Sequence, residues 1–200
     1  MLTSVSSQEQ QIVMSIAQFQ EFFDHCVGTW TTERTYHYLT HQEVERSHTE
    51  FVIYPINSEI KSQVLADNQC STEHNLEELP GYRLAFETVS EKGDKVSQQL
   101  HILFVPQKVE LPYIEGDYLR DKAYEEAKPM IAHFRYDVHT RELLMTTQYS
   151  RVVSVDSITL INPQLRIRKI LNYQRPLEDQ PLETVVLAGF GVEQKQADNS

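Results

Sequence analysis

The chain has 200 residues, 40% of them hydrophobic and 24% charged, which is typical of one globular domain able to bury a substantial core. Its formal net charge of -11 would make a nucleic acid or an anionic membrane surface repel it, so neither is an expected partner. The two cysteines have no pairing pattern, and no signal peptide or membrane-length apolar run is visible. A soluble, cytoplasmic protein in a reducing compartment is therefore expected.

One helix is predicted near the N-terminus, between Ser15 and Gly28. Ser15 and Gln18 have the spacing of a capping box, and Met14 can pack on Phe19 as a hydrophobic staple. Gly28 supplies the C-terminal stop. The apolar face of this helix carries Ile16, Phe19, Phe22, Phe23 and Cys26. Such a helix predicts a lid or a plug over an apolar interior.

After Gly28 the chain changes to short stretches of alternating character, which predict successive strands. In the first of them, one face carries Trp30, Thr32, Arg34, Tyr36 and Tyr38. The predicted strands cover residues 30–39, 44–56, 60–65, 82–90, 95–105, 130–136, 142–149, 152–161, 165–173 and 184–192. Residues 116–128 are less clear and are compatible with a short helix before Pro129.

Many short strands joined by hairpin turns favour an antiparallel barrel or sandwich. The lack of further long helices argues against a doubly wound α/β fold. Gly28 and Trp30, directly after a helix, resemble the opening strand of lipocalin-like barrels. The expected fold is all-β: a lipocalin- or fatty-acid-binding-protein-like, antiparallel up-and-down β-barrel with an N-terminal helix. It forms a single domain over residues 1–200, with residues 1–14 and 194–200 frayed.

The predicted strand at residues 165–173 carries two arginines in alternate register. Because side chains alternate between the faces of a strand, Arg166 and Arg168 share one face, and Leu165 and Ile167 share the other. If the apolar side faces the core, the arginines lie on the surface. If the strand belongs to a ligand-holding barrel, they can point into a polar lumen and clamp an anionic ligand. The strand alone leaves both alternatives open.

Several common catalytic patterns are missing from the sequence. The six glycines never form a phosphate-binding loop, no G-x-S-x-G element occurs, and the eight histidines lack metal-ligand spacing. Cys26 is expected to be a small buried hydrophobic residue, and nothing near Cys70 predicts a reactive thiol. The sequence therefore predicts no metal site and no cofactor of the protein's own.

Four segments together are similar to one known family. They are residues 28–37, 116–129, 156–168 and 190–193, which match G-x-W-x-x-x-R-T-x-H, G-x-L-L-R-x-x-x-Y-x-E, E-x-I-W-F-A-x-P-N-L-R-x-R and F-x-S-E. On these segments the chain resembles the S/U-type phycobiliprotein chromophore lyases, the CpcS/CpeS family, which have a lipocalin-like barrel. The four segments occur in consistent order along nearly the whole chain.

Departures from the family pattern indicate a divergent subgroup. The family's aromatic residue in the third segment is Thr159 here, its acid is the shorter Asp156, and Ile170 replaces a serine. A tryptophan of the middle strand corresponds to Phe86. These changes leave open whether the chain acts alone, as a homodimer, or beside a homologous lyase subunit.

The resemblance implies an enzyme that attaches an open-chain tetrapyrrole, a bilin of the phycocyanobilin type, to a cysteine of an apo-phycobiliprotein through a thioether bond. The bilin is then substrate rather than cofactor. The implied location is the cytoplasm of a cyanobacterium, or a plastid stroma. Because the attacking thiol belongs to the partner protein, no nucleophile of this chain is needed, and catalysis comes from positioning.

The same resemblance suggests roles for individual residues. Arg34, Arg166 and Arg168 are expected to bind the propionates of the bilin, since a guanidinium can donate two parallel hydrogen bonds to a carboxylate. The catalytic candidates are Asp156 and Glu193, carboxylates that could stabilise a protonated, more electrophilic pigment. The expected apolar walls of the pocket are Leu84, Phe86 and Tyr149.

Other interpretations stay open at this point. The barrel could carry fatty acids or similar amphiphiles, or the chain could be a non-catalytic partner that stabilises a second lyase subunit. Arg168 could simply pack on Trp30 to close the barrel base, and Arg34 and Arg166 could be ordinary surface residues. Glu193 could be solvated, and Asp156 could belong to a turn.

Overall fold

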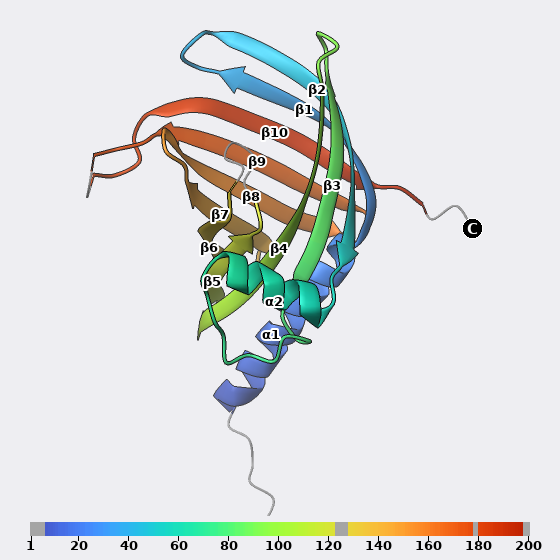
Figure 1. The fold of residues 1–200 in the computed structure, drawn as a ribbon, viewed down its shortest axis with the longest axis vertical. Coiled ribbons are helices and arrows are strands. Elements are labelled where there is room, and N and C mark those ends of the chain that lie inside the picture. The colour runs from blue at the N-terminus through green and yellow to red at the C-terminus, as the bar shows by residue number, and fades with distance from the viewer. Residues whose placement is uncertain (1–6, 123–127, 178–179, 198–200) are drawn as a thin grey trace, which may run out of the picture.

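The computed structural model describes residues 7–122, 128–177 and 180–197. Within these ranges ten strands form one closed antiparallel barrel, and two helices lie against it (Figure 1). The elements are α1 (Ser7–Cys26), β1 (Gly28–Tyr38), β2 (Glu43–Pro55), α2 (Ser58–Asp67), β3 (Gly81–Ser90), β4 (Lys95–Glu110), β5 (Tyr113–Arg120), β6 (Met130–Asp137), β7 (Glu142–Gln148), β8 (Val152–Asn162), β9 (Leu165–Gln174) and β10 (Val185–Lys195). The predicted up-and-down barrel with an N-terminal helix is confirmed.

The barrel closes where the first strand meets the last one. β1 pairs with β2 on one side and with β10 on the other, so that Trp30 is opposite both Phe51 and Lys195. Closure leaves the described sheet without a free edge for pairing with another chain. It also places β10 between β1 and β9, the two strands that carry the candidate arginines.

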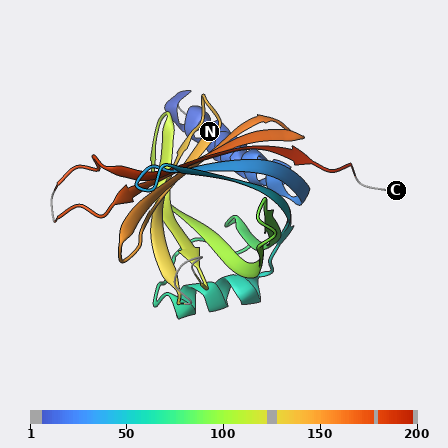
Figure 2. The same ribbon diagram turned by 90° about the horizontal axis from the view of Figure 1, so that it is seen from above.

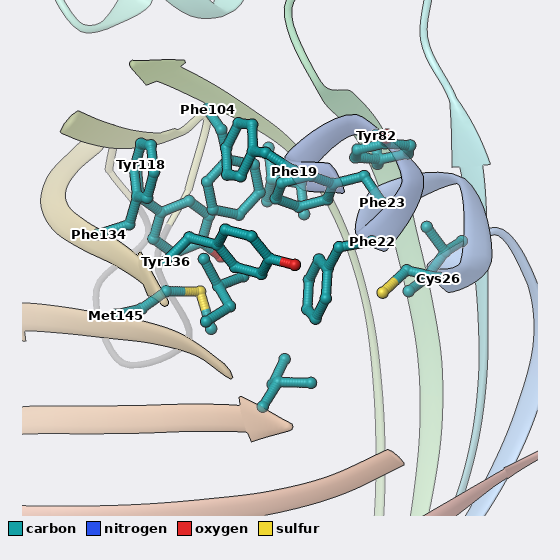
Figure 3. Close-up of a cluster of buried hydrophobic side chains, with 14 of the residues drawn as sticks. Phe19, Phe22, Phe23, Cys26, Tyr82, Phe104, Tyr118, Phe134, Tyr136 and Met145 are labelled. Atoms are coloured by element: carbon teal, nitrogen blue, oxygen red, sulfur yellow. The ribbon is translucent and has the colours of Figure 1, made fainter. Parts of the chain in front are cut away.

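Helix α1 covers one end of the barrel and inserts an aromatic face into the interior (Figure 3). The ring of Phe23 lies 4.5 Å from that of Phe104, and the ring of Phe22 lies 5.1 Å from that of Tyr136. Each buried phenylalanine contributes about 1.5–3 kcal/mol relative to an exposed one. The expected plug is confirmed for the buried Phe19, Phe22, Phe23 and Cys26.

The predicted start of α1 was wrong. The helix begins at Ser7, and the hydroxyl of Ser15 donates to the carbonyl of Gln11 at 2.9 Å inside it. Met14 is 63% exposed and Ile16 is also exposed, so neither the staple nor this part of the apolar face forms. A serine that bonds the carbonyl four residues back is tolerated within a helix, which makes a capping-box pattern ambiguous. Residues 7–14 were expected to be frayed but are helical. Residues 194–200 were also expected to be frayed, but β10 continues to Lys195.

The predicted strand at residues 60–65 was also wrong, because this segment belongs to α2. The side chain of Asn57 accepts a hydrogen bond from the backbone N–H of Ile60 at 3.0 Å and caps the helix. Val64 packs in a cluster with Leu103 and Leu119 against the outside of β4 and β5, and Figure 2 shows α2 outside the barrel wall. Six residues with three apolar positions are too few to distinguish a strand from a helix by periodicity.

The unclear segment at residues 116–128 continues β5 as far as Arg120, and residues 123–127 lie outside the described residues. Gly116 is required in this strand, since a β-carbon there would lie 2.1 Å from the carbonyl oxygen of Val105. The close approach occurs beside an irregularity in the pairing of β4 with β5. Neither described helix combines the length and apolar character needed to cross a membrane.

Candidate functional site

Strand alternation turns three arginines toward the barrel interior. Arg166 on β9 is only 3% exposed, and Arg34 on β1 and Arg168 on β9 line the same interior cavity. Arg34 and Arg168 are level with each other, because both are opposite Gly191 of the intervening β10. The sequence left open whether these arginines lie on the surface or point into the lumen, and in the structure they point into the lumen.

Glu193 of β10 lies between the arginine-bearing strands and is completely buried. It accepts a hydrogen bond from Arg166 Nε at 2.6 Å and another from Arg34 Nη2 at 3.2 Å. Burial by itself would raise the pKa of Glu193, but the surrounding arginines more than offset this effect and lower the pKa. Glu193 is thus an ionised anchor for the arginines and is poorly suited to donate a proton.

Two stacked aromatic rings flank this ion pair. The guanidinium of Arg166 lies 4.6 Å from the ring centroid of Trp30 and 5.2 Å from that of Phe51. The indole N–H of Trp30 donates to the carbonyl of Cys26 at 2.9 Å, which joins the end of α1 to β1. A cation above an aromatic face is attracted by the ring quadrupole, most strongly when water is excluded. Arg166 is therefore fixed at the base of the barrel by a carboxylate and two rings.

A second ion pair lies farther along the lumen. Arg168 Nε donates to both carboxylate oxygens of Asp156, at 2.9 and 3.1 Å, and its Nη2 bonds the same group. Asp156 lies within β8 rather than in a turn, and both side chains are about one-sixth exposed. A forked arginine–carboxylate contact of this kind fixes the plane of both groups.

The ion pairs border a largely apolar cavity of about 310 Å³. The wall of this cavity includes Leu84 and Phe86, two of the expected wall residues, together with Phe104 and Tyr118. The Nε atom of Arg34 is buried there without a hydrogen-bond partner among the described residues. An apolar cavity with a few polar groups is the usual form of a small-molecule site.

A second cavity of about 230 Å³ adjoins the first and contains Tyr149. Arg120, which sequence reasoning missed, is 1% exposed here and donates to Tyr149 Oη at 3.1 Å and to Thr147 Oγ1 at 3.2 Å. Its guanidinium lies 5.0 Å from the ring of Tyr118. A strand assignment for residues 116–120 would have placed Arg120 and Tyr118 on the same face.

All eight candidate residues thus occur along one lumen, seven at the two cavities and Glu193 buried behind the arginines. Cys26 also lines the first cavity, but burial raises the pKa of its thiol despite the nearby Arg166, so it is a weak nucleophile near neutral pH. Burial likewise raises the pKa of Cys70. The described ranges contain no cluster of three or more metal-ligating side chains.

These features define a lipocalin-like binding barrel with arginine–carboxylate pairs in an apolar lumen. The model of the CpeS-like protein family matches residues 18–196. The chain is 55% identical, over 90% of its length and 98% of the relative, to "Chromophore lyase CpcS/CpeS 1" of Synechococcus sp. (strain JA-3-3Ab). The chain therefore belongs to the CpcS/CpeS family of chromophore lyases.

More distant relatives agree with this assignment. "Phycocyanobilin lyase subunit CpcS" of Picosynechococcus sp. (strain ATCC 27264 / PCC 7002 / PR-6) is 22% identical over 78% of each chain. The solved structure of the S-type phycobiliprotein lyase CPES from Guillardia theta is 17% identical and has a TM-score of 0.71, with 90% of this chain and 94% of that chain covered. This structural likeness supports the fold.

Proposed function

We propose that the barrel binds an open-chain tetrapyrrole of the phycocyanobilin type and attaches it to a cysteine of an apo-phycobiliprotein. The observation that carries this proposal is the set of inward arginines in an apolar lumen, in a chain that belongs to the chromophore lyase family. A tetrapyrrole has a long apolar body and two propionates, and it needs these two kinds of surface together.

The arginines suit the propionates. Arg34 and Arg168 both line the first cavity, and Arg168 is held there by Asp156. Glu193 keeps Arg34 and Arg166 in place, so that the donors are oriented before the pigment arrives. Leu84 and Phe86 provide apolar contact for the rings.

Asp156 is the better placed of the two proposed catalytic carboxylates, because it borders both cavities. There it can accept hydrogen bonds from pyrrole N–H groups and stabilise a protonated pigment, which is the better electrophile. The partner's thiol sulfur then adds to the ethylidene carbon of the terminal ring, and the thiol proton completes the addition on the pigment. No oxidant or reductant is consumed, and Glu193 acts by positioning the arginines.

The partners in this proposal are the bilin and apo-phycobiliprotein subunits, with a homologous lyase subunit or a second copy of the chain as a further partner. The corresponding location is a cyanobacterial cytoplasm or a plastid stroma. The protein supplies no cofactor of its own in this scheme, since the pigment is the substrate.

Phycocyanobilin mixed with the purified chain tests the proposal. A red-shifted, intensified absorption band is expected, followed by covalent transfer to an apo-subunit that survives denaturation. Arg168→Ala should weaken pigment binding about tenfold or more, because charge-assisted hydrogen bonds are lost. Arg83→Ala is the matched control, since Arg83 is exposed and donates to Gln99 at 2.7 Å.

Three other results would lead to different conclusions. Tight binding of a fatty acid without binding of the bilin would favour a carrier. Transfer that occurs only after a homologous chain is added would assign a partner-subunit role. Normal pigment binding by a folded Arg168→Ala variant would refute the propionate contact.

A further inference from the structure

The ring of Tyr36 lies against a strand that carries no side chain at that point. Tyr36 on β1 lines the first cavity and is directly opposite Gly189 of β10. A β-carbon at Gly189 would lie 2.8 Å from Cδ1 and 2.9 Å from Cε1 of the Tyr36 ring, closer than real β-carbons approach other atoms. The ring therefore occupies the space that a side chain at residue 189 would need. Only glycine is compatible with this placement of the ring.

The strand on the other side of Tyr36 offers the ring less room. Tyr36 is directly opposite Glu45 of β2, and residues opposite each other in an antiparallel pair project from the same face of the sheet. The position next to Tyr36 on β2 thus holds a full side chain, whereas Gly189 on β10 holds none. A ring that had to leave Gly189 would turn toward the middle of the lumen and take up cavity volume.

Tyr36 belongs to the same cross-strand row as Asp156. Gly189 is opposite Ile170 of β9, and Ile170 is opposite Asp156 of β8. Three strand spacings, about 14 Å along the wall, separate Tyr36 from Asp156, and the ring over Gly189 covers the first of them. Tyr36, Ile170 and Asp156 line both cavities. A ligand in either cavity therefore borders this row.

We infer that the ring of Tyr36 is a contact surface for a pyrrole ring of the tetrapyrrole, an inference that rests on the proposed function. The pigment is flat and conjugated, and offset stacking on an aromatic ring favours binding beyond the burial of apolar area. A pyrrole ring packed on Tyr36 lies in the row of Asp156, the carboxylate proposed to accept hydrogen bonds from pyrrole N–H groups. Gly189 is a positioning residue, because it keeps the Tyr36 ring against the wall.

A second glycine of β10 has the same relation to Arg34. A β-carbon at Gly191 would lie 3.0 Å from Cγ of Arg34. Arg34 is directly opposite Gly191, as Tyr36 is opposite Gly189. The two proposed pigment contacts of β1 are thus both seated on glycines, which keeps the space in front of β10 open.

Equilibrium titrations with phycocyanobilin test both residues in one double-mutant cycle. Tyr36→Ala should weaken binding about tenfold because the ring contact is lost, and Tyr36→Phe, which keeps the ring, should bind within about twofold of the wild type. Gly189→Ala should also weaken binding about tenfold, since it turns the ring into the lumen. In Gly189→Ala/Tyr36→Ala the ring is gone, so the loss should stay at about tenfold instead of the roughly hundredfold of two independent losses.

Phe190→Ala is the matched control. Phe190 adjoins Gly189 on β10 but lies on the outer face of the barrel, where it is 50% exposed. This variant should bind the pigment like the wild type. Circular dichroism melting checks that each variant is folded, and the two Tyr36 variants test the ring contact even if Gly189→Ala does not fold.

Four results would overturn the inference. If the wild type binds phycocyanobilin and folded Tyr36→Ala binds it within about twofold, the ring contact is wrong while the proposed function stands. An approximately tenfold loss in Tyr36→Phe would assign the contact to the hydroxyl instead of the ring. A roughly hundredfold loss in the double variant would refute the positioning role of Gly189. If the wild type itself does not bind phycocyanobilin, the proposed function fails, and the ring contact fails with it.

Discussion

Replacement of Arg166 by methionine tests the charge network at the base of the barrel. Arg166 and Glu193 are 4% and 0% exposed at the side chain and are joined by a 2.6 Å hydrogen bond. In the variant, Glu193 would remain buried and keep its 3.2 Å ion pair with Arg34, and Trp30 would lose the guanidinium of Arg166 above its ring. Stability should therefore fall sharply although methionine fills much of the same volume.

The size of the loss follows from the burial of the pair. Removing one partner of a buried ion pair costs about 3–5 kcal/mol, because the other charge is left poorly compensated. In a chain of this length each kcal/mol shifts the melting temperature by about 2–4 °C, so Arg166→Met should lower Tm by about 10 °C. In Arg166→Met/Glu193→Leu both charges are gone, and the loss should be smaller than the sum of the two single losses.

Urea titrations and thermal melts of the wild type, both single variants and the double variant complete the cycle. The fluorescence of Trp30, the only tryptophan, reports directly on the site, and circular dichroism reports on the barrel. A Tm for Arg166→Met within about 2 °C of the wild type would refute the reasoning, as would strictly additive losses.

Two further predictions concern the pH dependence of stability and the close backbone packing at Gly116. The folded chain lowers the pKa of Glu193 below its ordinary value, so this group stabilises the fold above pH about 4.3 and loses its contribution as pH falls through the lowered pKa. Unfolding midpoints between pH 3 and 7 should therefore differ most between wild type and Glu193→Gln near neutrality; a difference that grows on acidification would contradict the assigned direction. Gly116→Ala places a β-carbon 2.1 Å from the carbonyl oxygen of Val105, and urea unfolding should show a loss of about 1–3 kcal/mol. An unchanged unfolding midpoint would mean that β4 shifts away from the new β-carbon without loss of stability, and would contradict this prediction.

Much of the fold could be predicted from the sequence because strand alternation is a local signal. The stretch from Trp30 to Tyr38 alternates clearly and forms β1 as expected. The strand prediction for residues 60–65 was wrong because the secondary structure of this segment depends on the packing of Val64 against Leu103, a residue distant in sequence. The Asn57 cap was the local signal that could have corrected it.

The site was predictable only in part. Alternation alone put Arg166 and Arg168 on one face, but their carboxylate partners depend on strand register. Glu193 meets Arg166 because β10 pairs with β9, and Asp156 meets Arg168 across β8 and β9. Arg120 was missed because no strand had been assigned to its segment.

Closure of the sheet between β1 and β10 has a consequence for biosynthesis. The first and last strands supply Arg34 and Glu193, which are 159 positions apart. A ribosome-bound chain that still lacks its last strand has neither the buried carboxylate nor a sealed wall. Under the proposed function, a polypeptide that lacks β10 is therefore not expected to hold the pigment.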